Sequence, residues 1–242
     1  WSAQAADNVI CISEALKDFF EKGGLIDASK LITIPYGFNF SSIELDPNIK
    51  NFQYGNPQIV VTGRLEEVKQ HHLLIECIPE LLKDFPSISI VMVGDGSLAS
   101  SLKSLGESLG VDDKIKWLGF QKNVHNFIQA SDIMIIPSSA EGFGLVVLES
   151  WFHAKPVIAF NVPAINEIID HKKNGLLIEP FSRTDLIKAI KSILRDKDML
   201  YEYGKAGRDK QKNVYDIEIM VNKTSYVLNE LYIKKQSLDN RA

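Results

Sequence analysis

Residues 133–149 read Ile-Met-Ile-Ile-Pro-Ser-Ser-Ala-Glu-Gly-Phe-Gly-Leu-Val-Val-Leu-Glu. An apolar run at 133–136 precedes a loop with two glycines, and a helix is expected to begin at about Gly144. A short apolar run without polar alternation is typical of a strand buried on both faces. A strand, a glycine-containing loop and a helix in succession indicate a parallel α/β sheet.

The same alternation extends through most of the chain. Further apolar runs lie at 59–61, 88–93, 115–118, 157–159 and 176–178, and helices are expected near 69–84, 97–109, 123–130, 144–153, 164–170 and 183–195. This spacing predicts an α/β domain with a doubly wound parallel sheet over residues 58–215. Pro79 lies inside the first of these helices, where we expect a bend or an exposed break.

The two ends of the chain have different patterns. Residues 1–57 contain two short apolar runs, 9–12 and 31–34, a helix that starts at Ser13, and a polar stretch at 41–57 that looks like a linker. We interpret 1–57 as the tail of a domain that lies mostly upstream of Trp1, so that the chain is a fragment. Residues 216–242 have apolar side chains at helical spacing and predict a helix that packs on the sheet or on a domain absent from this chain.

Composition excludes several classes of protein. The chain has 45% hydrophobic and 24% charged residues, which are ordinary globular values. Its net charge of −4 argues against a nucleic-acid binder. Only two cysteines occur, so we expect no disulfide framework and a cytoplasmic location. Residues 182–242 carry a net charge of +4, which indicates either a solvated helix surface or a weakly basic face that contacts an anionic membrane.

Glu141 and Glu149 bracket the loop and helix start described above. Gly142 and Gly144 allow a close backbone approach, and the first N–H groups of a helix attract anions. Glu149 would lie about 7.5 Å along the helix from Gly144. Two carboxylates could then flank a phosphate site and accept hydroxyl groups of sugar diols. The alternative is an ordinary helix N-terminus with a second Glu by chance.

Two other loops follow predicted strands. Gly63, Arg64 and Lys69 come after the run at 59–61, and the two cations could converge on a phosphate group, although loop Arg and Lys residues are often plain surface charges. Residues 94–99 match a dinucleotide fingerprint, but they follow the second strand and no acidic residue ends the next one. We therefore read them as a tight strand–helix turn without a nicotinamide cofactor.

Metal and nucleophile motifs are absent from the sequence. The five histidines are scattered or adjacent, and no H-x-x-x-H, C-x-x-C or G-x-S-x-G pattern occurs. We expect neither a structural zinc ion nor a serine hydrolase.

Taken together, these segments resemble the retaining glycosyltransferases of group 1, or family 4. The matching pieces are Gly63-Arg64 with Lys69, the turn at 93–96, Trp117 to Phe120, Ser131-Asp132, the Glu-x7-Glu pair at 141 and 149, Pro156 to Ile158, Glu167 to Ile169 and Asn174 to Leu177. The resemblance covers about residues 5–215 and implies the C-terminal, donor-binding domain of a two-domain GT-B fold, with a Rossmann-like sheet.

The resemblance also implies roles for individual residues. Arg64 and Lys69 would neutralise the donor diphosphate beside the turn at Gly63, Glu149 would hold the ribose diol, and Glu141 would face the transferred sugar. Main-chain N–H groups of Phe143, Gly144 and Leu145 would bind sugar hydroxyls or phosphate, and the base would lie near Gly119, Phe120, Gln121 and Val124. No divalent metal or other cofactor is then required.

The predicted donor is a UDP-sugar or a GDP-sugar, and the predicted acceptor is a glycan or a lipid-linked saccharide. The chain departs from the family at Asn161 to Asn166, where glycines are common, and at Tyr36, where Asn is usual, so the donor sugar stays open. Two alternatives also stay open: a nucleotide-sugar epimerase of the same architecture, and a non-catalytic nucleotide-sugar binding module.

Overall fold

The structure, a computed structural model, describes residues 2–41 and 43–239. The chain divides into two compact units, one of residues 40–209 and one of residues 1–39 with 210–242. Among the described residues no helix is both long enough and apolar enough to cross a membrane.

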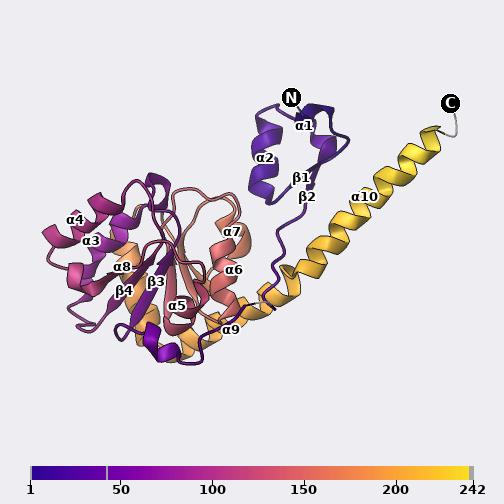
Figure 1. Ribbon diagram of the computed structural model, residues 1–242. Coiled ribbons are helices and arrows are strands. Elements are labelled where there is room, and N and C mark those ends of the chain that lie inside the picture. Colours follow the sequence, from indigo (N-terminus) through magenta and orange to yellow (C-terminus); the bar gives the residue numbers. More distant parts are fainter. Residues whose placement is uncertain (1, 42, 240–242) are drawn as a thin grey trace. The chain divides into compact units, whose positions relative to one another are not determined.

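The larger unit is built on a six-stranded sheet (Figure 1). Its strands are β3 (Gln58–Thr62), β4 (Ser89–Val93), β5 (Ile115–Trp117), β6 (Ile133–Ile136), β7 (Val157–Phe160) and β8 (Gly175–Ile178). They are all parallel and lie in the order β5-β4-β3-β6-β7-β8. The doubly wound parallel sheet predicted from the sequence is confirmed.

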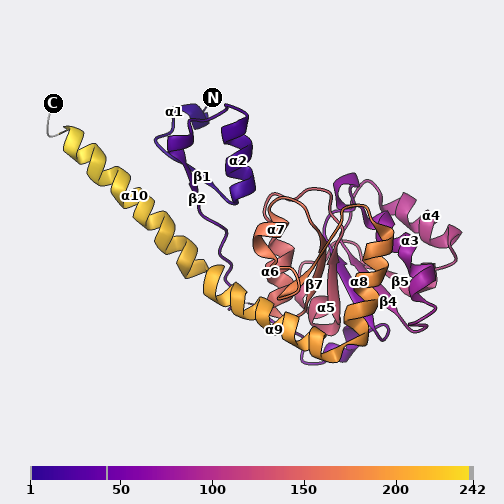
Figure 2. The same ribbon diagram turned by 180° about the vertical axis from the view of Figure 1, so that it is seen from behind.

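Helices cover both faces of this sheet (Figures 1 and 2). They are α3 (His71–Leu81), α4 (Ala99–Ser108), α5 (His125–Ala130), α6 (Leu145–Phe152), α7 (Ile165–Ile168) and α8 (Arg183–Arg195), with short 3-10 turns η2 (Ile49–Phe52), η3 (Glu67–Lys69) and η4 (Asp112–Lys114). Helix α3 packs against α4 and α8, and α5 packs against α6.

Helix α3 runs without interruption through Pro79, so the break expected as one alternative at this residue is wrong, and the bend expected as the other stays a prediction. Pro79 lies in the last turn of the helix, and it is exposed. The ring therefore faces solvent, and only the final residues of the helix follow it. A proline in this position disturbs the hydrogen-bond ladder less than one in mid-helix.

The core of the unit consists of the strands and the helix faces that pack on them. Every residue of β4, β6 and β7 is buried. Trp151 is fully buried in α6, and its Nε1–H donates to the carbonyl oxygen of Asn174 at 3.1 Å. Burying each large apolar side chain stabilises the folded state by about 1.5–3 kcal/mol. The sheet and its helices therefore hold the loops at the strand ends in place.

Residues 43–57 pack on the sheet unit. Phe52 lies edge-on to Phe127 of α5 with 5.1 Å between ring centroids, and the backbone N–H of Asp46 donates to Asn126 Oδ1 at 2.9 Å. Phe40 stacks on Phe152 of α6 at 4.5 Å. The segment predicted as a linker is therefore part of the sheet unit, which begins at Phe40 rather than at Gln58.

The smaller unit contains both ends of the chain. It includes α1 (Ser2–Ala5), α2 (Glu14–Lys22), η1 (Ala28–Lys30) and two parallel strands, β1 (Val9–Cys11) and β2 (Leu31–Thr33). The Ser13 hydroxyl caps α2 by accepting from the Leu16 N–H at 3.1 Å. The predicted strands and helix start in this region are confirmed.

The chain ends in two long helices. Helix α9 (Lys197–Val214) runs from the larger unit into the smaller one, and α10 (Ile217–Asp239) follows it. Helix α10 confirms the predicted helical tail, whereas α9 was not among the expected helices. Tyr226, Leu228 and Tyr232 of α10 are all about 60% exposed or more.

Candidate functional site

The strand order places the topological switch point of the sheet between β3 and β6. From β3 the chain moves outward to β4 and β5, and from β6 it moves the opposite way to β7 and β8. The loops after β3 and β6 therefore leave in opposite directions and open a crevice at the carboxyl ends of the strands. Doubly wound sheets bind their ligands in such a crevice.

Three glycines build the edge of this crevice. Gly63, Gly94 and Gly119 follow β3, β4 and β5, and all three have positive φ angles. The Gly63 N–H donates to the Val93 carbonyl at 2.9 Å, and the Gly94 N–H donates to the Gly119 carbonyl at 2.8 Å. A Cβ on Gly94 would lie only 1.8 Å from the Gly63 oxygen. The backbones approach this closely because no side chain separates them.

A cavity of about 320 Å³ opens at this edge. It is lined by Thr62, Gly63, Arg64, Val93, Gly94, Asp95, Phe120, Gln121, Val124, Val146 and Glu149. The sequence prediction named Gly63, Arg64, Phe120, Gln121, Val124 and Glu149 as binding residues. The fold thus brings residues from four separate segments to one hollow.

Glu149 lies on the second turn of α6 and faces the cavity. Burial raises the pKa of its carboxyl to about 7, because the charged form loses hydration. No salt bridge involves Glu149 in the described part of the chain. An acceptor in this state gains from a ligand that donates hydroxyl hydrogen bonds.

Arg64 and Lys69 lie in different surroundings. Arg64 is exposed, lines the cavity and forms no salt bridge with a described residue. Lys69 is outside the lining, and its Nζ lies 2.6 Å from Glu141 Oε1. Arg64, Lys69 and Glu141 are the three residues that we predicted from the sequence to be catalytic. Arg64 lines the cavity, whereas Lys69 and Glu141 bind each other.

The start of α6 follows the predicted loop closely. Gly144 caps the helix with a φ of 101°, and Leu145 is the first helical residue. Phe143 and Gly144 are buried, Leu145 is 36% exposed, and the lining of the cavity includes none of them. Their predicted role in binding sugar or phosphate through main-chain N–H groups stays a prediction.

Comparison with known proteins decides the family. The profile of "Glycosyl transferases group 1" matches residues 42–210, which nearly coincide with the sheet unit. The chain belongs to this family.

The chain is also similar to solved structures and to curated proteins of known name. HepE of Anabaena, crystallised with UDP and glucose, superposes with a TM-score of 0.86 at 23% identity, over 94% of this chain and 64% of that one. The C-terminal domain of LpcC, a group 1 protein of Francisella tularensis, has a TM-score of 0.67 at 26% identity, and the match covers 75% of this chain and all of that domain.

A curated relative of Escherichia coli is named UDP-Gal:alpha-D-GlcNAc-diphosphoundecaprenol alpha-1,3-galactosyltransferase. It is 26% identical over 243 residues, which cover 96% of this chain and 62% of the relative. The chain therefore spans less than two thirds of the length of this relative and of HepE.

Several cavity residues of this group 1 chain were missed from the sequence. Thr62 is the last residue of β3, Val93 is the last residue of β4, and Asp95 lies in the loop after β4. Val146 lies one turn before Glu149 on α6. The segment at Asp95 was interpreted as a tight turn and as one piece of the family resemblance, without a binding role for Asp95. The Gly96 N–H does donate to Asp95 Oδ1 at 2.8 Å. Proximity to the switch point is the signal that could have identified Asp95.

The segment where the chain departs from the common group 1 pattern packs on the Gly144 loop. Ala164 is buried and has a φ of +68°, which glycine adopts more readily, and such strain costs on the order of 1–3 kcal/mol. A Cβ on Gly144 would lie 2.6 Å from Ile165 Cδ1. The two segments are therefore fitted to each other, and a substitution in one affects the other.

Among residues 2–41 and 43–239, no group of three or more His, Cys, Asp or Glu side chains is arranged to hold a metal ion.

Proposed function

We propose that the larger unit binds the nucleotide-sugar donor of a retaining glycosyltransferase, and that the donor is a UDP-sugar. The cavity at the switch point carries this proposal, because it combines an unpaired cation, a desolvated carboxyl and apolar side chains in one hollow. The UDP bound to HepE supports the choice of nucleotide, and GDP is the alternative.

The proposed diphosphate position lies beside Gly63 and Arg64. The leaving group of the transfer is a nucleoside diphosphate, so negative charge grows on a phosphate oxygen as the sugar departs. A guanidinium at that oxygen lowers the barrier, and Lys69 adds a second positive charge. With Arg64 and Lys69 supplying the positive charge, the proposal requires no divalent metal.

The proposed nucleoside position extends from Glu149 to Phe120. Glu149 accepts the two ribose hydroxyls, which restores hydrogen bonds to a carboxyl that burial has desolvated. The Phe120 ring is 80% exposed at the cavity, so it is available to pack against a base. Val124 adds apolar contact, and the Gln121 side chain already donates to the Leu118 carbonyl at 2.8 Å.

The sugar is proposed to lie toward Glu141 and the start of α6, with retention of its anomeric configuration. The acceptor is proposed to be a glycan or a lipid-linked saccharide, as in the name of the E. coli relative. For the whole protein we further propose that α10 packs on an N-terminal acceptor domain, and that the protein acts in the cytoplasm, in peripheral contact with the inner face of the membrane.

Calorimetric titration of the chain with UDP and with GDP tests the proposal. Saturable binding of UDP, with weaker binding of uridine, is the expected result. A folded sample that binds neither nucleotide contradicts it. Incubation of a bound sugar nucleotide without acceptor then tests the epimerase alternative, since an epimerase forms product under these conditions and a transferase does not.

A second titration tests the ribose contact. Glu149→Gln should weaken UDP binding and hardly change the binding of 2′-deoxy-UDP, which already lacks one hydroxyl partner. An equal loss for both ligands means that Glu149 does not hold the ribose.

A further inference from the structure

The Lys69–Glu141 ion pair joins two loops that follow neighbouring strands. Lys69 ends the 3-10 turn η3 after β3, and Glu141 lies in the loop after β6. Their side chains are only 16% and 11% exposed, and Nζ lies 2.6 Å from Oε1. The two loops are also tied by Ser139, whose N–H and hydroxyl both donate to the Val68 carbonyl, at 2.8 and 3.1 Å. An enclosed pair of this kind is little weakened by salt.

This pair lies next to the cavity. Gly63 lines the cavity, and a Cβ on Gly63 would lie 3.8 Å from Lys69 Cε. Arg64, the next residue, faces the cavity without a salt bridge to any described residue. Of the two cations proposed for the diphosphate, one is therefore available and the other is already neutralised by a carboxylate.

We infer that Glu141 is an internal competitor for the phosphate groups of the ligand, so that a diphosphate binds by replacing the Glu141 carboxylate at Lys69. This inference rests on the proposed function. An ammonium group accepts a carboxylate or a phosphate oxygen as its partner, so the exchange keeps Lys69 paired.

The exchange has a direct consequence for selectivity. A ligand without phosphate cannot displace the carboxylate, and a ligand with a diphosphate must repay the broken ion pair. The released Glu141 carboxylate is then beside the diphosphate, where like charges repel unless sugar hydroxyls donate to it. Glu141 thus lowers the affinity of the site for a diphosphate that carries no sugar, relative to its affinity for a sugar nucleotide, and leaves uridine binding unchanged.

Calorimetric titration of Glu141→Gln with UDP, GDP and inorganic pyrophosphate tests the inference. We expect about tenfold tighter binding of UDP and pyrophosphate than by the wild type, which corresponds to about 1.4 kcal/mol. Binding of uridine should not change. Pyrophosphate reports on the exchange even if neither base suits the site.

Glu76→Gln is the matched control. Glu76 pairs with Arg183 at 3.0 Å and lies outside the cavity lining, and its replacement changes the net charge by the same amount. This variant should bind every ligand as the wild type does. Equal tightening in both variants means that a general charge effect operates, which overturns the inference.

A double-mutant cycle with Lys69→Gln completes the test. Glu141→Gln should tighten pyrophosphate binding much less in the Lys69→Gln background, where only the direct repulsion between the carboxylate and the ligand remains. If Glu141→Gln instead weakens UDP binding, the carboxylate positions Lys69 for the ligand and the inference is wrong. Should Glu141→Gln fail to fold, as checked by its melting curve, Glu141→Ala carries the same expectation.

The outcomes separate the inference from the proposed function. If the wild type binds UDP and Glu141→Gln binds it equally well, only the inference fails. If no variant binds UDP, GDP or pyrophosphate, the proposed function fails and the inference with it.

Discussion

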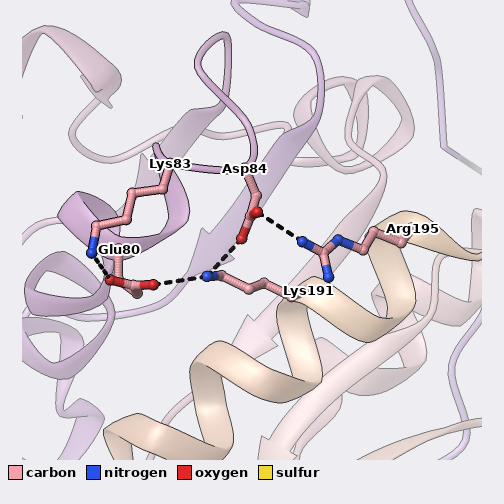
Figure 3. Close-up of polar contacts among 5 residues, drawn as sticks. All are labelled: Glu80, Lys83, Asp84, Lys191 and Arg195. Carbon is pink, nitrogen blue, oxygen red and sulfur yellow. Dashed lines mark hydrogen bonds and ion pairs between the residues drawn. The ribbon is translucent and has the colours of Figure 1, made fainter.

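Two regions of the larger unit differ in how their charged side chains are paired. One is the contact between α3 and α8, and the other is the cavity at the switch point. Between the helices, Lys191 Nζ lies 3.0 Å from Glu80 Oε1 and 2.6 Å from Asp84 Oδ2, and Arg195 Nη2 lies 2.7 Å from Asp84 Oδ1 (Figure 3). Lys83 pairs with Glu80 as well. Hydrogen bonds from these cations lower the pKa of Glu80 and Asp84, and the hydrogen bond to Asp84 raises the pKa of Lys191.

At the cavity the pKa of a carboxyl shifts in the other direction. Burial raises the pKa of Glu149 to about 7, and no cation forms a salt bridge with it among the described residues. Arg64 nearby is likewise without a salt bridge. The difference teaches that charges are paired in the contact between α3 and α8, whereas Glu149 and Arg64, which line the cavity, form no salt bridge with a described residue. Sites that bind ligands commonly carry a cost in stability.

The largest expected effect on stability comes from a substitution that disturbs the close backbone packing beside the cavity, and not from one that removes a charge. Gly94→Ala should lower the free energy of unfolding by more than about 3 kcal/mol, because a Cβ at φ +146° would overlap the Gly63 carbonyl oxygen. Urea denaturation measures this loss. Gly142→Ala is the control, since a Cβ there meets nothing within 4 Å, and a similar loss in both would show that the close approach at Gly94 is not the cause.

The second effect tests the contrast between the raised pKa of Glu149 and the lowered pKa values of Glu80 and Asp84. Above pH 4.5 the unfolded chain ionises Glu149, whereas the folded chain holds the proton until about pH 7, so the contribution of Glu149 to the free energy of unfolding falls as the pH rises between these values. Glu149→Gln lacks this loss and should be more stable than the wild type at pH 8, by at most about 3 kcal/mol.

Denaturation of both proteins at pH 4 and pH 8 measures the effect, and the two should converge at pH 4. Glu107→Gln, a change of an exposed carboxyl on α4, should alter nothing at either pH. A wild-type advantage at pH 8 would mean that Glu149 is stabilised in its charged form.

A third substitution, Arg64→Ala, should affect ligand binding without affecting the stability of the fold. Arg64→Ala should weaken UDP binding by about tenfold to a hundredfold, because hydrogen bonds to charged groups contribute about 1.5–3 kcal/mol. Its melting temperature should stay that of the wild type, since the Arg64 side chain forms no salt bridge with any described residue.

Arg195→Ala is the control for Arg64→Ala, and both variants are measured by calorimetry and by melting curves. It removes a partner of Asp84 and should leave UDP binding intact. If Arg195→Ala weakened UDP binding as much as Arg64→Ala does, the division between the two charged regions would be wrong.

The smallest effect is expected in the α3–α8 network itself. Asp84→Asn should lower the melting temperature slightly at neutral pH, and less in high salt, because exposed ion pairs are screened. Since the pKa of Asp84 is lowered in the fold, its contribution is present above pH 3.8 and is lost as the pH falls further. Melting curves should therefore show a larger difference at pH 7 than at pH 2.5.

Much of the architecture could be predicted because local patterns carry it. The run at 133–136 is apolar at every position and is buried at every position, as a strand between two helix layers requires. The helix start at Gly144 follows from a glycine with positive φ ahead of an apolar pattern. The exception, Pro79, shows that a local rule fails when the residue lies in the last turn and faces solvent.

Residue type and spacing by themselves determined the sheet, its glycine turns and the identity of the groups at the strand ends, since each depends on a few neighbouring residues. Only the tertiary structure decided which of these groups meet. Lys69 and Glu141 are 72 residues apart and form an ion pair, and Lys191 meets Glu80 across 111 residues. Phe52 and Phe127 are also far apart in the sequence, and their rings are in contact. A stretch with a polar, linker-like sequence therefore belongs to the sheet unit. Burial and pairing depend on what the fold brings together, and a pattern along the chain does not contain that information.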